Sequence, residues 1–188
     1  MSIVRLLCLT TALCIASVTA ACSSASRPGS DSSPDGAKPG ATASPDPSDA
    51  IQRYVTGEDN DFADLQGDPM HSSSPSYAYY GSTQPIPGTA NCVVYVFKQS
   101  SSHFAHCDVA ATTLAAAKTA YQTWLSNVKD AEPYWHAIEV QPLPAGDVAA
   151  TMYADNREEH GIYVSVSKVG ASSYRVSATF AKMAALKS

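Results

Sequence analysis

Histidines and carboxylates are the residues here that a metal site or an acid–base centre would use. His103 and His106 are three positions apart, a spacing that occurs among metal ligands. On a β-strand, residues i and i+3 point to opposite faces, so a strand over this segment predicts that the two imidazoles diverge. His71, His136 and His160 are distant in sequence from one another. A site that brings histidines together only in the folded protein therefore remains an alternative.

An acidic run between positions 58 and 68 could suggest calcium binding. Its members are Glu58, Asp59, Asp61, Asp64 and Asp68. An EF-hand loop also needs a ligand at position 63, then a glycine and a closing glutamate, which this run lacks. We therefore interpret it as the solvated face of a helix, and we expect no metal and no cofactor.

The sequence contains no recognised nucleophile, phosphate-binding or dinucleotide-binding motif. Tyrosines gather instead in the first half of the expected domain and again near position 134. Because tyrosine is enriched where proteins bind partners, we take Tyr77, Tyr79, Tyr80 and Tyr134 as a candidate binding surface. The competing interpretation is that alternate members of this group fill the core.

The first 21 residues have the pattern of an export signal. Arg5 precedes an apolar segment from Leu6 to Val18, which is shorter than the about 20 residues that a membrane-spanning helix needs. The segment Val18-Thr19-Ala20-Ala21-Cys22 resembles the lipobox of bacterial membrane lipoproteins, although Thr19 stands where that family usually has an apolar residue. The resemblance implies that Cys22 is diacylated and becomes the N-terminus. Ordinary secretory cleavage after Ala20, which would release a secreted protein, is the alternative.

Residues 22–45 consist almost entirely of Ser, Pro, Gly, Ala and Asp, which predicts a disordered tether. Residues 46–188 are apolar enough to form one domain. The chain has 12 Lys and Arg against 17 Asp and Glu, and only Arg5 would leave with the signal. Without a basic stripe, nucleic acid is not expected as a partner.

Cys92 and Cys107 are the cysteines that remain after the signal (Cys8, Cys14) and the lipid site are accounted for. Segments 91–98 and 103–108 read as two strands around a serine-rich turn. If Val96 faces His103, then Cys92 faces Cys107 on the same side, so the register permits a disulfide in an oxidising compartment.

Hydrophobic periodicity and turn residues predict an α+β fold in the order α-β-β-β-α-β-β-β-β, with a mostly antiparallel sheet and the helices packed on one face. The expected helices are 47–66 and 111–129. The expected strands are 76–82, 91–98, 103–108, 134–141, 147–155, 161–168 and 173–181.

A second resemblance rests on F-x-x-L-x-G at Phe62 to Gly67 and P-G-x-x-x-C at Pro87 to Cys92. These motifs are similar to those of small exported bacterial proteins of unassigned function, which implies a fold and no activity. We predict a lipid-anchored cell-envelope protein, on the periplasmic face of the outer membrane in a Gram-negative cell. Its domain is expected to be a non-enzymatic module for an envelope protein, a toxin or the cell wall. An envelope hydrolase with an unrecognised active site is the alternative.

Overall fold

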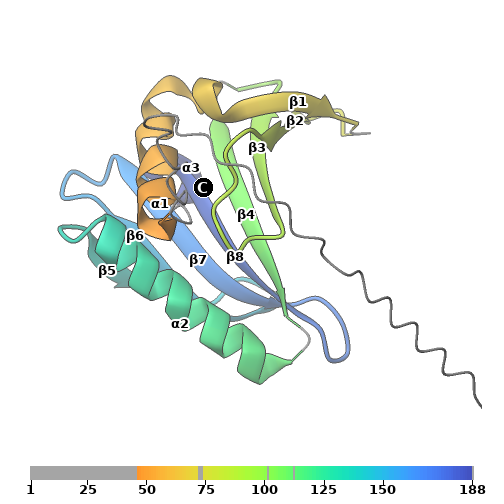
Figure 1. Ribbon diagram of the computed structural model, residues 1–188, viewed down its shortest axis with the longest axis vertical. Helices are drawn as coiled ribbons and strands as arrows, with labels where there is room; N and C mark the ends of the chain where they lie inside the picture. The colour runs from red at the N-terminus through yellow and green to blue at the C-terminus, as the bar shows by residue number, and fades with distance from the viewer. Residues whose placement is uncertain (1–45, 72–73, 101, 112, 188) are drawn as a thin grey trace, which may run out of the picture. The chain divides into compact units, whose positions relative to one another are not determined.

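The computed structural model describes residues 46–71, 74–100, 102–111 and 113–187 (Figure 1). The predicted signal peptide, Cys22 and the tether lie outside these residues. The described elements are α1 Pro47–Gly57, β1 Gln66–Met70, β2 Tyr77–Ser82, β3 Asn91–Phe97, β4 His103–Ala111, α2 Leu114–Ala131, β5 His136–Glu139, β6 Asp147–Ala154, β7 His160–Lys168, β8 Tyr174–Lys182 and α3 Met183–Leu186, with short 3-10 turns at Glu58–Asn60 and Ala63–Leu65.

All eight strands form one antiparallel sheet in the order β1-β2-β3-β4-β8-β7-β6-β5. Each half of the chain is a helix followed by a four-stranded meander. Apart from α3, every helix and strand of the second half begins between 67 and 71 residues after its counterpart, from 47 to 114 for the helices and from 103 to 174 for the last strands. Since β4 and β8 pair at the centre, the two halves are related by an approximate two-fold axis between them.

The helices α1 and α2 cover the same face of the sheet (Figure 1). Each begins at a capping side chain: Asp46 accepts from the Ser48 N–H, and Thr113 accepts from the Ala116 N–H. The core between helices and sheet is built from the apolar sides of these elements. Its largest fully buried side chains include Tyr54 of α1 and Phe180 of β8, whose ring centroids are 5.0 Å apart.

The opposite face of the sheet, which we call the open face, carries the alternate residues of the same strands. In the described part of the chain, α3 is the one helix that reaches it. Gly161, on the open side of β7, makes room for this helix, because a Cβ atom there would come within 2.4 Å of Met183 Sδ. Met183 is accordingly buried.

The predicted hairpin is confirmed. Val96 pairs with His103, Val94 with Ala105, and Cys92 with Cys107, and the two cysteines form a disulfide. The antiparallel sheet is also confirmed, and α1 and α2 pack on one face as predicted, whereas α3 lies on the other face and the fold contains more strand than helix.

Several boundaries differ from the predictions: the helix predicted over 111–129 spans Leu114–Ala131, and the strand predicted over 103–108 continues to Ala111. The helix predicted over 47–66 ends at Gly57, because Asp61 and Phe62 adopt left-handed conformations with φ of 56° and 59°, and the Phe62 N–H bonds back to the Gly57 carbonyl. The following residues, Gln66–Met70, form β1, so the order is α-β-β-β-β-α-β-β-β-β and not α-β-β-β-α-β-β-β-β. Helix α3 was also not predicted.

Among the described residues, no helix has the length and hydropathy required to cross a bilayer.

Candidate functional site

Six large apolar side chains form a continuous patch on the half of the open face that belongs to β1–β4. This patch, which we call the aromatic patch, consists of Met70, Tyr77, Tyr79, Tyr95, Phe97 and Phe104. Its rings contact one another across three strands: the centroids of Tyr79 and Tyr95 are 4.8 Å apart, and Tyr95 stacks on Phe104 at 4.4 Å. All five rings are half-buried, whereas Met70 is 51 % exposed at the edge strand.

The four tyrosines of the predicted binding surface are not all in one place. Tyr77 and Tyr79 lie together in the aromatic patch, with centroids 5.1 Å apart. Tyr80, the neighbour of Tyr79 on β2, points to the helix-covered face and packs against the core. Tyr134 is 85 % exposed in the connection between α2 and β5.

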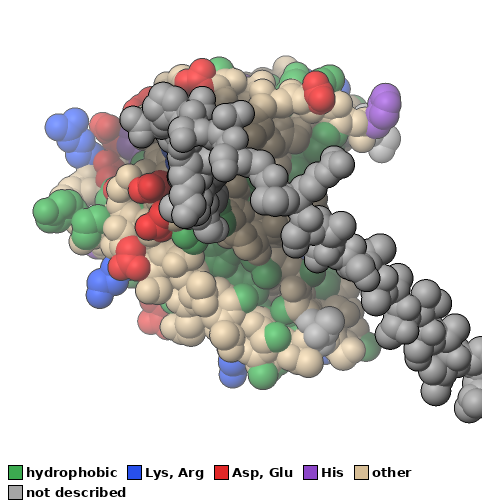
Figure 2. Space-filling model, in the orientation of Figure 1, with side chains coloured by type: hydrophobic (Ala, Val, Ile, Leu, Met, Phe, Trp, Pro, Cys, Tyr) green, Lys and Arg blue, Asp and Glu red, His purple; other side chains and the backbone are tan. Residues whose placement is uncertain are grey.

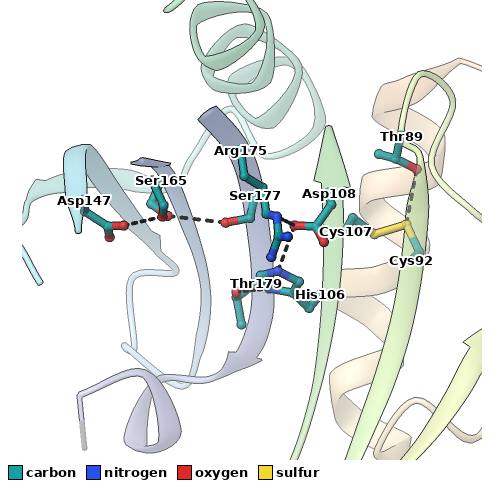
Figure 3. A network of polar contacts seen from close by, with 11 residues as sticks. Thr89, Cys92, His106, Cys107, Asp108, Asp147, Ser165, Arg175, Ser177 and Thr179 are labelled. Atoms are coloured by element: carbon teal, nitrogen blue, oxygen red, sulfur yellow. Dashed lines mark hydrogen bonds and ion pairs between the residues drawn. A yellow bond between two sulfur atoms is a disulfide. The ribbon is translucent and has the colours of Figure 1, made fainter. Parts of the chain in front are cut away.

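A group of polar side chains lies next to the aromatic patch, on β4 and β8 (Figure 3). His106 Nδ1 is 2.9 Å from Thr179 Oγ1, and His106 Nε2 is 3.0 Å from Asp108 Oδ1. Arg175 Nε lies 3.9 Å from the same Asp108 oxygen. The imidazole is therefore fixed between a hydroxyl and a carboxylate, with its plane nearly perpendicular to the Tyr95 ring.

The second half of the open face carries fewer aromatic rings and more small and polar side chains. Ser165 and Ser177 are buried and face each other across β7 and β8 at 3.3 Å (Figure 3). Asp147 accepts hydrogen bonds from Tyr163 and Ser167. Burial and this bond to Asp147 raise the pKa of the Tyr163 phenol. The cluster of contacting aromatic rings is thus a feature of the first half.

The prediction that His103 and His106 diverge is confirmed. His106 is on the open face, whereas His103 Nδ1 lies 3.6 Å from Asp61 Oδ1 on the helix-covered side. Lys182 Nζ is 3.5 Å from the same Asp61 oxygen. Two basic groups from β4 and β8 therefore hold the turn that follows α1.

The fold places His160 beside the acidic run between positions 58 and 68. The interpretation of this run as the solvated face of a helix is wrong for Glu58. The Glu58 residue is 1 % exposed. Its Oε2 is 3.0 Å from His160 Nδ1, while His160 Nε2 lies 3.4 Å from Asp59 Oδ1. Among the described residues, Glu58 Oε1 has no hydrogen-bond partner.

Burial raises the pKa of the Glu58 carboxyl to about 9, and the charges of Asp59 and Asp155 add to this, whereas the Gly161 N–H and Lys182 oppose it. At neutral pH the group is therefore protonated, within hydrogen-bond distance of His160 Nδ1. Asp59 is exposed, as predicted. No sequence signal distinguished Glu58 from its acidic neighbours, because its burial depends on strands that follow more than 40 residues later.

A small cavity of about 180 Å³ adjoins this cluster, lined by Glu58, Asp61, His103 and Lys182 together with Phe62, Ser102, Ala184 and Ala185. The left-handed turn at Asp61 and Phe62 places one side chain at the cavity and the other in the core. Acidic side chains are visible over α1 and this turn on the helix-bearing face (Figure 2). Across the described ranges, no three His, Cys, Asp or Glu side chains are grouped as metal ligands.

A larger cavity of about 530 Å³ opens on the open face between the end of the β3–β4 hairpin, β8 and α3. Phe97 and Phe104 of the aromatic patch form one of its walls, and Thr179, the hydroxyl partner of His106, lines it as well. The polar group and the aromatic patch therefore meet at this cavity.

Comparison with known proteins adds no assignment. No family model matches the sequence, and no curated protein or solved structure is significantly similar to the chain.

Proposed function

We propose that the protein is a lipid-anchored component of the cell envelope whose domain binds a partner protein through the aromatic patch. The observation that carries this proposal is the concentration of Met70, Tyr77, Tyr79 and their ring neighbours on one half of an open sheet face. Methionine and aromatic side chains are enriched at protein interfaces, and tyrosine supplies apolar area there with little loss of conformational entropy. The anchor at Cys22 belongs to the proposal as the inference drawn from the lipobox-like segment.

A protein partner suits this surface better than a cell-wall glycan. Met70, Phe97 and Phe104 offer no hydrogen-bonding group, and carbohydrate recognition relies on many of them. The rings of Tyr77, Tyr79 and Tyr95 also pack edge to face, with interplanar angles between 64° and 90°, so they cover one another's faces. Fewer ring faces are then left on which a sugar could stack.

Site-specific photo-crosslinking tests the proposal in intact envelopes. A photoreactive phenylalanine analogue replaces Tyr79 in the full-length protein, and in separate variants Tyr134 or Val148, both exposed outside the patch. We expect a discrete adduct with one protein at position 79 and none at the two control positions. Equal adducts at all three positions, or none at 79, would contradict the proposal.

Affinity for the crosslinked protein then gives a second, quantitative test. Tyr79→Ala is expected to weaken binding by about 1 to 2 kcal/mol, which is the loss typical of a central aromatic contact. Tyr134→Ala serves as the matched control and should leave affinity unchanged. Thermal unfolding of both variants separates a lost contact from a lost fold.

The hydrolase alternative is favoured by one observation, the row Thr179, His106, Asp108, in which an imidazole joins a hydroxyl to a carboxylate at 2.9 and 3.0 Å. Hydrolysis also needs donors for the developing oxyanion. In the described wall of the adjacent cavity, the further polar groups are the hydroxyls of Ser100 and Ser102. The binding function therefore has the stronger support.

A further inference from the structure

Met70 places a thioether at the exposed margin of the aromatic patch. It is the register partner of Tyr79 in the β1–β2 pairing, and residues opposed in this way point to the same face of the sheet. Because β1 is an edge strand, the Met70 side chain has a neighbouring strand on one side only. Its residue is 51 % exposed, whereas the rings beside it are half-buried. A small dissolved reagent can therefore reach this side chain.

The other two methionines of the described chain are better covered. Met152 is half-buried on β6, with β5 on one side and β7 on the other. Met183 at the start of α3 is 1 % exposed. Both cysteines of the described ranges form a disulfide, so neither offers a thiol. Among these sulfur-containing side chains, Met70 is therefore the one on which a dissolved oxidant acts first.

Hydroperoxides oxidise a thioether by transfer of one oxygen atom. A sulfur lone pair forms the new S–O bond while the O–O bond of the peroxide breaks, and the proton of the transferred oxygen moves to the departing oxygen. With hydrogen peroxide the products are methionine sulfoxide and water, so the sulfur loses the two electrons that the peroxide gains. Methionine sulfoxide reductases reverse the change.

Oxidation would change the chemistry of the patch at its most exposed residue. The thioether is flexible and apolar, whereas the sulfoxide is polar and carries a hydrogen-bond acceptor. A partner that covers Met70 with apolar atoms would have to bury this oxygen without a donor, and burial of an unpaired polar group is costly. The oxidised patch is therefore a poorer match for the same partner.

We propose that Met70 is a site of reversible oxidation that controls the aromatic patch: a hydroperoxide converts it to the sulfoxide, which weakens binding of the protein partner, and reduction restores binding. Because this control rests on the proposed function, oxidation and binding are measured separately.

Hydrogen peroxide tests the selectivity of oxidation on the purified full-length protein alone. Peptide mass spectrometry follows the oxygen gained at each methionine, in buffer and in denaturant. In buffer, Met70 is expected to oxidise severalfold faster than Met152, and Met183 last, in the order of their exposure. In denaturant the three rates should converge. A folded protein in which Met152 or Met183 oxidises as fast as Met70 overturns the proposal.

Affinity for the protein that crosslinks at position 79 tests the effect on binding. Peroxide treatment of this protein, with the partner left untreated, is expected to weaken binding about tenfold, which corresponds to the burial of one unpaired polar group. Incubation of the oxidised protein with a methionine sulfoxide reductase should restore the affinity. Unchanged affinity of a protein oxidised at Met70 overturns the proposal.

Two variants assign the effect to one sulfur atom. Met70→Leu removes the thioether, so its affinity, whatever the value, should no longer respond to peroxide. Met152→Leu is the matched control, because it changes a methionine on the same face and outside the patch, and it should retain the response. A peroxide response that persists in Met70→Leu overturns the proposal.

The two measurements also distinguish this proposal from the proposed function. If no adduct forms at position 79, the partner site itself is refuted, and the control of binding falls with it. If the adduct forms and affinity ignores oxidation, the patch still binds and Met70 does not control it. Thermal unfolding before and after treatment checks that the weaker binding reflects a changed contact, and unfolding caused by oxidation of Met70 would contradict the proposal.

Discussion

Glu58 is the residue at which folding changes ordinary side-chain chemistry most. An exposed glutamate ionises near pH 4.5, whereas burial raises the pKa of Glu58 to about 9. The carboxyl group can remain inside because, when protonated, it carries no charge and lies within hydrogen-bond distance of His160. The same arrangement links the turn after α1 to the start of β7.

This pKa shift makes stability depend on pH. Between pH 4.5 and 9 the folded state retains a proton that the unfolded chain has released, so this contribution is fully present below pH 4.5 and is lost as the pH rises toward 9. Glu58→Gln preserves the shape and the donor without the titration. We expect it to raise the free energy of unfolding at pH 7 by roughly 2 to 3 kcal/mol and to flatten its decline with pH.

Denaturant unfolding of both proteins between pH 5 and 9 measures this effect. Glu139→Gln, which changes an exposed carboxyl on β5, is the matched control and should reproduce the pH dependence of the native protein. A Glu58→Gln variant that is less stable than the native protein at pH 8 would contradict the assignment of Glu58 as a buried neutral acid.

The sequence predicted well to which face of the sheet a side chain points, because successive residues of a strand alternate between the two faces. The divergence of His103 and His106 follows from their odd spacing on a strand. The same rule separates Tyr79 from Tyr80, which the predicted binding surface had grouped together. Contacts such as that of Glu58 with His160 join residues 102 positions apart, and they follow from the topology of the sheet.

At the scale of elements, the β3–β4 hairpin is the part that sequence predicted most completely, because strand alternation and a cysteine pair specify the same register. The disulfide closes a loop with a sequence separation of 15 residues. In the chain-entropy model, closing such a loop contributes about 3 kcal/mol to stability.

Replacing both cysteines by alanine should therefore lower the free energy of unfolding by roughly 2 to 4 kcal/mol. Urea denaturation measures this loss, and the reduced native protein should show a similar one. Purified protein in which alkylation labels both thiols without prior reduction would contradict the bond.

Strand β1 shows why other elements could not be predicted. Its sequence, Gln66 to Met70, contains glycine, aspartate and proline, which are depleted in strands. Proline is tolerated because β1 is an edge strand, where a missing N–H costs little. Its place in the sheet comes from pairing with β2, and a local pattern contains no information on that pairing.

At the scale of the whole molecule, the approximate two-fold repeat has two halves with the same topology and different open faces. The open face of β2–β4 carries the contacting rings of the aromatic patch, whereas that of β6–β8 carries Tyr163 among small and polar side chains such as Ser165 and Asp147. The ring cluster therefore lies on one side of the β4–β8 junction. A partner that binds the aromatic patch, as we propose, would lie toward the β1 edge.

Attachment to the membrane would determine which partners this face can meet. Two acyl chains on Cys22 would hold the protein stably, because a single chain gives only marginal binding. If residues 22–45 form the disordered tether that their composition predicts, roughly 25 residues would place the domain about 25 to 30 Å from the lipid surface. The domain could reorient freely enough for its open face to reach proteins in the same membrane.

Cys22→Ala should therefore move the protein from the membrane fraction to the soluble fraction, or leave its precursor uncleaved. Cys14→Ala is the matched control, because it changes a cysteine of the same signal outside the lipobox-like segment. Fractionation and mass spectrometry of the mature N-terminus measure both variants. A native protein that begins with an unmodified Ala21 would contradict the anchor, and the aromatic patch would then serve a secreted module, whose partners are not confined to one membrane.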